Sequence, residues 1–244
     1  GAFKQLLFLG LQPYLKKYLS KPITKENILE AEDILTKHGL PFHKAGWEYI
    51  LKEHNGYLPI SIEAIPEGTV LPTHNALVQV VNTDPKCFWL PTYIETSLLR
   101  SIWYVSTVAT YSWHCKQIIK KYLEETSDSI ESLDFKLHDF GARGVSSLES
   151  AGLGGCAHLV NFKGTDTLAG IIAAKEFYSE PMAGFSIPAA EHSTITAWGK
   201  EHEEQAFENM LDKFAGKDKL VAVVSDSYDL YSAIEHIWGA SLKQ

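Results

Sequence analysis

The side chains that could do chemistry lie in four short polar clusters, all in the second half of the chain. The first two clusters carry an aromatic ring at Phe140, a guanidinium at Arg143 and a carboxylate at Asp166. The third carries the imidazole of His192, which titrates near neutrality and can act as a base or a nucleophile. An aromatic face, a cation, a carboxylate and an imidazole together suit a planar ring with polar edges beside an anionic group.

Each of these residues also has an ordinary structural interpretation. Asp166 could cap the helix that follows it, and Asp229 in the fourth cluster could cap the last helix or, with Asp226, ligate a metal. Arg143 could form a surface salt bridge, and Phe140 could belong to the core. The imidazole could simply bond a backbone carbonyl. Residue types alone leave these alternatives open, so the elements that carry the clusters have to be considered.

The elements that position the clusters alternate between short apolar strands and helices. Apolar runs at residues 133–137, 159–162, 185–187 and 220–224 each lead into one polar cluster. Such repetition predicts parallel strands, and ligands of parallel sheets and barrels lie at the carboxyl ends of the strands. The glycine-rich phosphate turn of a doubly wound sheet does not occur in the sequence, so a (β/α) barrel fits better. Because a barrel needs about eight strands, residues 131–244 are predicted to form only its first half, incomplete in this chain.

The preceding part of the chain predicts an N-terminal mixed α/β domain over residues 1–130. Apolar residues at helical spacing predict a helix at residues 24–38, closed by a glycine. Alternating residues predict half-buried strands at residues 60–64 and 77–81. The apolar and aromatic stretch at residues 93–125, which lacks glycine and proline, predicts one or two packed helices. The predicted fold class is therefore α/β, a partial irregular (β/α) barrel behind a mixed domain.

Capping residues mark helix starts in the second half of the chain. Ser146 with Glu149 three residues later matches a capping box, and Thr165 or Thr167 precedes the next apolar helix. The first nine residues are mostly apolar and lack the basic n-region of a signal peptide. They predict a chain that begins part-way into a structural element.

Composition narrows the classes of function. Of the 244 residues, 45% are hydrophobic, which is enough for a sizeable core. A net charge of −8 argues against broad nucleic-acid binding, which relies on many lysine and arginine contacts to phosphate. No apolar run reaches the roughly 18 residues of a membrane span, so neither nucleic acid nor a membrane is an expected partner. Cys87, Cys115 and Cys156 have no zinc-site spacing and predict reduced thiols in a cytoplasmic protein.

The polar clusters, taken with their neighbours, resemble successive motifs of the nicotinamide phosphoribosyltransferase family of type II phosphoribosyltransferases. The resemblance runs in order along nearly the whole chain and corresponds to the N-terminal and middle portion of such an enzyme. The matching stretches are residues 82–85, 94–96, 138–147, 157–167, 188–199 and 224–229.

The resemblance implies an irregular α/β barrel flanked by an α/β domain, in a homodimer. It implies a glycosyltransferase that joins nicotinamide to phosphoribosyl pyrophosphate, giving nicotinamide mononucleotide and pyrophosphate in NAD salvage. Mg²⁺ would be bound through the substrate pyrophosphate, without protein ligands of its own. ATP would act as an activating co-substrate that phosphorylates His192.

The resemblance also implies a role for each candidate residue. Phe140 would stack on the pyridine ring, and Arg143 would hold phosphate or diphosphate near the amide carbonyl. Asp166 would accept a hydrogen bond from the carboxamide NH₂ and repel nicotinate. The expected catalytic residues are His192 and Asp229. The residues expected on the ribose side are Ser186, Ser225 and Asp229.

The chain departs from the family pattern in two ways. Ala142 and Phe185 stand where the family usually has tyrosine, which affects the expected affinity. The family's glycine-rich phosphate-binding loops are expected downstream of this chain, and the aromatic residue of the dimer partner upstream. The alternative to an enzyme is therefore a non-catalytic nicotinamide-binding or signalling fragment that lacks the phosphate-binding half, or one completed by a complementing chain. A relative that uses nicotinate is a third alternative, against which Asp166 argues.

Overall fold

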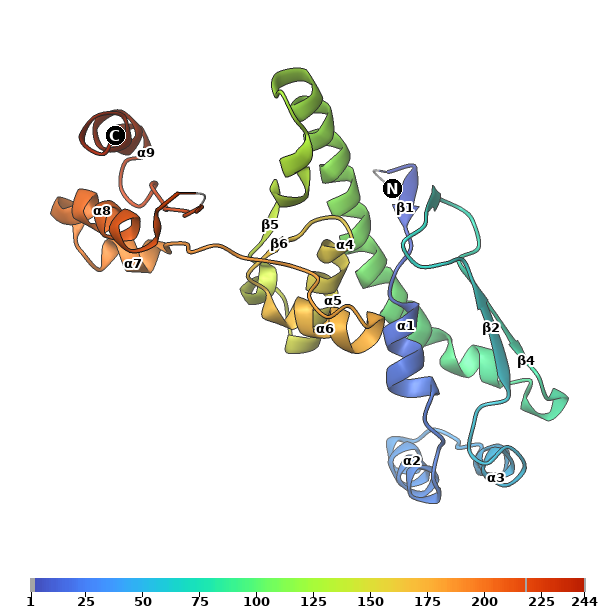
Figure 1. The fold of residues 1–244 in the computed structure, drawn as a ribbon. Helices are drawn as coiled ribbons and strands as arrows, with labels where there is room; N and C mark the ends of the chain where they lie inside the picture. Colours follow the sequence, from blue (N-terminus) through green and yellow to red (C-terminus); the bar gives the residue numbers. More distant parts are fainter. Residues whose placement is uncertain (1–2, 218, 244) are drawn as a thin grey trace. The chain divides into compact units, whose positions relative to one another are not determined.

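Helix α4 (Leu90–Thr126), with 37 residues, is the longest element of the computed structural model (Figure 1). It belongs to the first of two compact units, Gly1–Phe185 and Ser186–Gln244. The structure describes residues 3–217 and 219–243. A domain end at residue 130 stays a prediction. None of the described helices is both long and apolar enough to cross a membrane.

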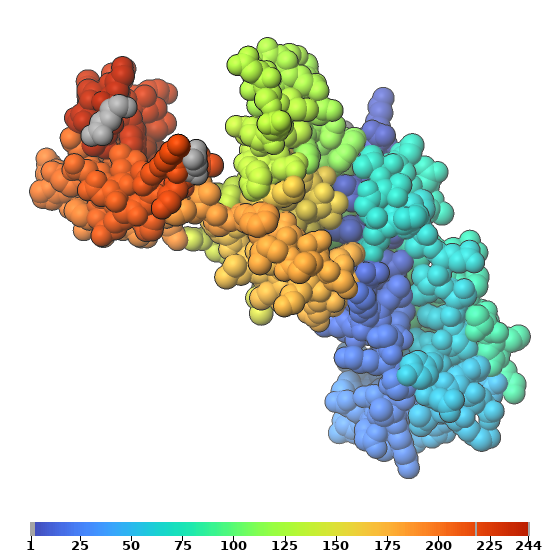
Figure 2. Space-filling model, in the orientation of Figure 1, coloured from blue at the N-terminus to red at the C-terminus, as the bar shows by residue number. Residues whose placement is uncertain are grey.

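The residue pattern of α4 explains why it is one continuous helix. Beyond Pro91 in its first turn it contains neither glycine nor proline. Its buried residues recur every three or four positions, as at Leu98, Ile102 and Val105, so one face packs on the core. Figures 1 and 2 both show its C-terminal half, in yellow-green, projecting from the rest of the first unit. The helical prediction at residues 93–125 is confirmed, as a single helix.

The segment around strand β1 (Gln5–Leu7) lies along α4. This strand pairs antiparallel with β3 (Val70–Pro72). The N–H of Leu7 donates to Thr110 Oγ1 at 2.9 Å, and the N–H of Leu9 donates to Ser106 Oγ at 3.0 Å. Buried N–H groups require partners, so these two hydroxyls of α4 fix the strand on the helix.

A carboxylate caps the next helical segment, α1 (Leu11–Tyr14) with its π-helical continuation η1 (Leu15–Leu19). Glu67 Oε1 accepts the N–H of Leu11 at 2.8 Å, and Oε2 accepts the N–H of Gln12 at 3.0 Å. The first N–H groups of a helix have no partner within it, and a negative charge there also suits the helix dipole.

The elements predicted for the N-terminal part are confirmed. Helix α2 (Lys25–His38) begins at a capping box formed by Thr24 and is followed by α3 (Lys44–Glu53). Strands β2 (Ile60–Ala64) and β4 (Val78–Asn82) form an antiparallel pair, the second lying one residue later than predicted.

Two glycine- and alanine-rich helices, α5 (Leu148–Leu159) and α6 (Leu168–Tyr178), pack closely against each other. At the contact, a Cβ added to Gly170 would lie 2.7 Å from the carbonyl carbon of Gly155. The two backbones can therefore approach only because neither position carries a side chain.

Two of the predicted apolar strands are wrong. Residues 133–137 lie in the 3-10 helix η3 (Glu131–Phe135) and the bend after it, and residues 159–162 complete α5 and the turn that closes it. A short apolar run does not by itself distinguish a strand from a buried helical segment. The predicted capping box at Ser146 is also wrong by one residue, because Ser147 is the N-cap of α5.

The strands follow directly after these runs. Strand β5 (His138–Asp139) pairs in parallel with β6 (Gly164–Thr165), and a parallel bridge joins Gly164 to Phe185. The parallel direction is confirmed, and with the two antiparallel strand pairs it gives a mixed α/β fold. The described residues form no closed barrel, so the half-barrel stays a prediction.

The second unit is mainly helical and has its own core, in which Phe207 stacks on Trp238 with ring centroids 5.0 Å apart. The strand predicted at residues 220–224 is reduced to a single parallel bridge between Ala222 and Ala189. The helical elements are α7 (His192–Thr196), η5 (Lys200–His202), α8 (Glu203–Phe214), α9 (Leu230–Ser232) and η6 (Ala233–Ser241).

Candidate functional site

Two adjacent strand ends carry the predicted residues of the first unit. Strand β5 leads into Phe140 and the 3-10 turn η4 (Gly141–Gly144), which holds Arg143. Strand β6 leads directly into Asp166, whose N–H donates to the carbonyl oxygen of Asp139 at 2.9 Å. The structure therefore brings Phe140 and Asp166 to neighbouring strand ends, with Arg143 in the turn that follows Phe140.

All three predicted side chains are open to solvent. Phe140 is 62% exposed, so the alternative that it belongs to the core is wrong. Arg143 is exposed, and the side chain of Asp166 is 37% exposed. Helix α6 begins with Thr167 as its N-cap residue, so Asp166 precedes the cap position. The aromatic residue and part of the carboxylate are thus exposed at this edge.

His138 connects these residues and was not singled out from the sequence. Its ring lies 4.6 Å from the Phe140 ring between centroids, tilted by 34°, and its Nε2 lies 3.3 Å from Asp166 Oδ1. The signal that could have found it is the alternation of a strand, which puts residues two apart on one face. His138 and Phe140 have this spacing.

A second histidine, His158 of helix α5, contacts strand β6. Its buried Nε2 lies 3.0 Å from the carbonyl oxygen of Gly164, and its ring stacks on Phe162 at 5.4 Å. Burial lowers the pKa of His158, although the bond to this carbonyl acts in the opposite direction. A neutral imidazole therefore joins the end of α5 to the strand that carries Asp166.

In the second unit, His192 is the first residue of α7, and its Nε2 lies 2.8 Å from Asp226 Oδ1. Both side chains are exposed. The bonding partner is a carboxylate, so the alternative of a histidine bonded to a backbone carbonyl is not what the structure shows. In a neutral imidazole that donates from Nε2, the nucleophilic lone pair lies on Nδ1.

The other predicted residues of the second unit make local bonds. Asp229 caps α9, because its Oδ1 accepts the N–H of Ser232 at 3.0 Å. The Ser225 hydroxyl accepts the indole N–H of Trp238 at 2.9 Å and donates to a backbone carbonyl. These bonds leave the second oxygen of the Asp229 carboxylate for other contacts.

Ser186 and Glu203 complete the polar residues considered in the second unit. The Ser186 hydroxyl donates to the carbonyl oxygen of Ile187 at 3.3 Å. Glu203, which the sequence did not point to, is buried, and burial together with the charge of Asp229 raises the pKa of its carboxyl. The predicted meeting of the candidates from both units around one cavity stays a prediction.

Comparison with known proteins decides the family. The sequence model of the nicotinamide phosphoribosyltransferase N-terminal domain matches residues 1–62, and that of the nicotinate phosphoribosyltransferase (NAPRTase) family matches residues 135–244. A nicotinamide phosphoribosyltransferase of Xanthomonas campestris pv. campestris is 56% identical over 245 residues, which cover 100% of this chain and 52% of the relative. The chain belongs to the nicotinamide phosphoribosyltransferase family. The resemblance inferred from the motifs is confirmed.

More distant relatives agree with this family. Nicotinamide phosphoribosyltransferases of Acinetobacter baylyi and Mycoplasma pneumoniae are 30% and 36% identical, covering 98% and 77% of this chain and 49% and 39% of the relatives. The chain thus spans about half the length of the curated relatives it matches. The crystal structure of human nicotinic acid phosphoribosyltransferase has a TM-score of 0.52 and 17% identity over 80% of this chain and 33% of that one. That likeness concerns the fold alone.

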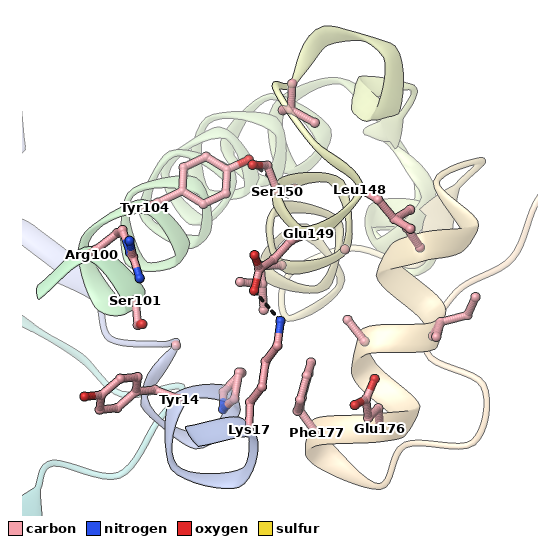
Figure 3. A pocket seen from close by; sticks show the side chains of 18 of the residues that line it. Tyr14, Lys17, Arg100, Ser101, Tyr104, Leu148, Glu149, Ser150, Glu176 and Phe177 are labelled. Atoms are coloured by element: carbon pink, nitrogen blue, oxygen red, sulfur yellow. Dashed lines mark hydrogen bonds and ion pairs between the residues drawn. The ribbon is translucent and has the colours of Figure 1, made fainter. Parts of the chain in front are cut away.

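This nicotinamide phosphoribosyltransferase family member also has an open cavity of about 1010 Å³ within its first unit. Figure 3 shows Tyr104 and Arg100 of α4 on one side and Phe177 of α6 on the other. An ion pair between Lys17 Nζ and Glu149 Oε1, 2.6 Å apart, crosses it. None of the residues predicted for nicotinamide binding lines this cavity.

One group of side chains has the composition of a metal site, with ligand atoms of His54, Asp84 and Cys87 within 4.8 Å of one another. The Asp84 carboxylate is already bonded by His54 Nε2, Tyr49 Oη and the N–H of Lys86, each at 2.8 Å. These hydrogen bonds lower the pKa of Asp84, while burial raises the pKa of the Cys87 thiol. A metal would have to replace these bonds and deprotonate the thiol, so the group is best described as a hydrogen-bonded junction.

Proposed function

We propose that the complete gene product carrying this chain joins nicotinamide to phosphoribosyl pyrophosphate, giving nicotinamide mononucleotide and pyrophosphate in NAD salvage. Family membership supports this pentosyltransferase activity. The observation that carries the choice of substrate is the Asp166 carboxylate at the end of β6, beside Phe140 at the end of β5.

In the proposed half-site, each side chain meets one part of nicotinamide. The exposed Phe140 ring stacks on the pyridine ring, which contributes about 0.5–1.5 kcal/mol beyond the area buried. Asp166 accepts a hydrogen bond from the carboxamide NH₂, whereas the carboxylate of nicotinate would be repelled. Arg143 holds phosphate or diphosphate and approaches the amide carbonyl, as a forked donor can.

The proposed reaction exchanges one bond at the ribose C1 atom. The bond from C1 to the pyrophosphate oxygen breaks, and pyrophosphate leaves with the electron pair. The lone pair of the pyridine nitrogen forms the new bond, so no proton has to be moved at this step. Holding the ring against C1 is the main contribution of Phe140 and Asp166. When bound through the substrate pyrophosphate, Mg²⁺ offsets the charge of the leaving group.

A second proposed step is phosphorylation of His192 by ATP. The Nδ1 lone pair forms the bond to the γ-phosphorus, and the bond to the ADP oxygen breaks. The proton remains on Nε2, in its hydrogen bond to Asp226. The Asp226 carboxylate offsets the positive charge that develops on the ring. Asp229, with Ser186 and Ser225, lies on the ribose side in this proposal. Phosphohistidine then places an anion near the sugar and favours turnover.

The proposal includes an assembly. Strands β5 and β6 with the bridge to Phe185 begin an irregular (β/α) barrel that is completed beyond this chain, in a homodimer or with a complementing chain. Support comes from the large apolar side chains that α4 exposes, among them Trp103 and Tyr122. A cytoplasmic location is proposed because all three cysteines are free thiols.

The deciding experiment measures nicotinamide mononucleotide formed by the complete gene product from nicotinamide and phosphoribosyl pyrophosphate, with and without ATP. Asp166→Asn is expected to reduce the preference for nicotinamide over nicotinate by tenfold or more, because the charge that repels nicotinate is removed. Asp212→Asn, at an exposed position of α8, is the matched control. Binding of nicotinamide without any mononucleotide formed would replace the enzyme with a non-catalytic binding function.

A further inference from the structure

The imidazole ring of His138 lies across the neighbouring strand, in space that Gly164 leaves open. In the parallel register His138 lies opposite Gly164, and the site residues Phe140 and Asp166 follow two positions later in the sequence. A Cβ at Gly164 would lie only 2.7 Å from His138 Nδ1, so the imidazole occupies the space that a side chain at this position would fill. The absence of a side chain at Gly164 therefore lets the ring lie across the neighbouring strand.

From this position the imidazole contacts both groups proposed to hold nicotinamide. Phe140 follows β5 directly, two residues after His138, and Asp166 follows β6 directly, two residues after Gly164. This spacing is that of residues on one face of a strand. The ring contacts Phe140 at 4.6 Å between centroids, and Nε2 lies 3.3 Å from Asp166 Oδ1. One side chain thus holds the stacking ring and the carboxylate relative to each other.

The contact with the carboxylate is close but not an aligned hydrogen bond. His138 Nε2 is buried and has no aligned hydrogen-bond partner, although Asp166 Oδ1 is within reach. A hydrogen bond from Nε2 to Oδ1 would fix the orientation of the carboxylate.

We propose that His138 is a specificity-determining positioning residue, which orients the Asp166 carboxylate and seats the Phe140 ring so that an amide is preferred to a carboxylate on the pyridine ring. This inference rests on the proposed function of the site. His138 acts through Asp166 and Phe140 and does not itself touch the reacting atoms.

The test uses the complete gene product and two substitutions at this position. His138→Phe keeps a ring against Phe140 but removes Nε2, and is expected to lower the nicotinamide-to-nicotinate ratio of kcat/KM at least tenfold. The loss should lie mainly in KM for nicotinamide, because kcat depends on groups at the sugar. His138→Gln retains an N–H donor at a similar distance, and its ratio should stay within threefold of wild type. His38→Phe, at an exposed position of α2, is the control.

A readout without turnover separates this inference from the proposed function. Side-chain ¹⁵N NMR of His138, assigned by its loss in His138→Gln, should shift in Asp166→Asn if the two groups interact. An unchanged substrate ratio in His138→Phe, with a collapsed ratio in Asp166→Asn, would overturn the role of His138 while leaving the proposed function intact. If wild type forms no mononucleotide, the proposed function fails, and an NMR signal indifferent to Asp166→Asn would overturn the positioning role as well.

Discussion

His192 and Asp226 form a bonded pair, with Nε2 of the imidazole 2.8 Å from Oδ1 of the carboxylate. The two residues are 34 positions apart in the sequence. Helix α7 presents the imidazole at its first position, and the segment before α9 presents the carboxylate. The pair fixes which ring nitrogen carries the proton, and this supports a nucleophilic role for Nδ1.

Replacement of Asp226 tests this pair. Asp226→Asn is expected to slow transfer of labelled γ-phosphate from ATP to His192 by about 100-fold, the low end of the effect of positioned acid–base groups. Asp212→Asn should leave the rate unchanged. Equal labelling rates in wild type and Asp226→Asn would contradict the proposed phosphorylation geometry.

Replacement of Glu67 tests the cap of α1. The carboxylate accepts the N–H groups of Leu11 and Gln12 and the hydroxyl of Tyr178, the last at 3.1 Å. Hydrogen bonds to a charged group contribute about 1.5–3 kcal/mol each, and Glu67→Gln retains part of this bonding. The free energy of unfolding in urea should therefore fall by about 1–3 kcal/mol. Glu63→Gln, on the exposed end of β2, should change it by less than about 0.5 kcal/mol.

A methyl group between α5 and α6 should destabilise the protein. Gly170→Ala gains about 1 kcal/mol of helix propensity. The added Cβ would, however, meet the backbone of Gly155 at 2.7 Å, and overpacking of this kind costs about 1–3 kcal/mol. Thermal unfolding should therefore occur at a lower temperature than in wild type. Gly144→Ala, where nothing lies within 4 Å of the added atom, should not show this loss, and an unshifted Gly170→Ala would refute the close contact.

The buried imidazole of His158 should make stability depend on pH. Its folded-state pKa is below the unfolded value of about 6.5, mainly because of burial. The unfolded state therefore binds more protons in this window, and stability is lost as the pH falls from about 6.5 toward the folded-state pKa.

His158→Gln removes the titrating group but retains a donor for the Gly164 carbonyl. The loss of unfolding free energy between pH 7.5 and pH 5.5 should be smaller in this variant than in wild type. The exposed variant His38→Gln should behave as wild type does. Parallel pH profiles for wild type and His158→Gln would show that another group is responsible.

The sequence predicted best where a local rule is sufficient. Helix α2 begins at Thr24 because a capping box is a contact between residues three apart, which periodicity and residue type reveal. The neighbouring placement of Phe140 and Asp166 followed from the rule that parallel strands end at the same edge. That rule held even though the strands themselves begin later than predicted.

The sequence could not predict contacts set by tertiary structure. Leu133 is apolar and buried, but its run forms a 3-10 helix rather than a strand. The Ser225 hydroxyl is bonded by Trp238, and the burial of Glu203 depends on packing within the second unit. His138 was missed because its importance comes from the missing side chain of Gly164 on another strand.

The continuity of α4 has a mechanical consequence. At 1.5 Å per residue its 37 residues span about 55 Å, and three separate apolar clusters of the first unit each include a residue of this rod, such as Leu90, Ile102 and Val105. A break between Leu90 and Val105 would separate these clusters from one another, so the antiparallel strand pairs near the start of the chain and the glycine-packed pair α5 and α6 should lose their structure in one concerted transition.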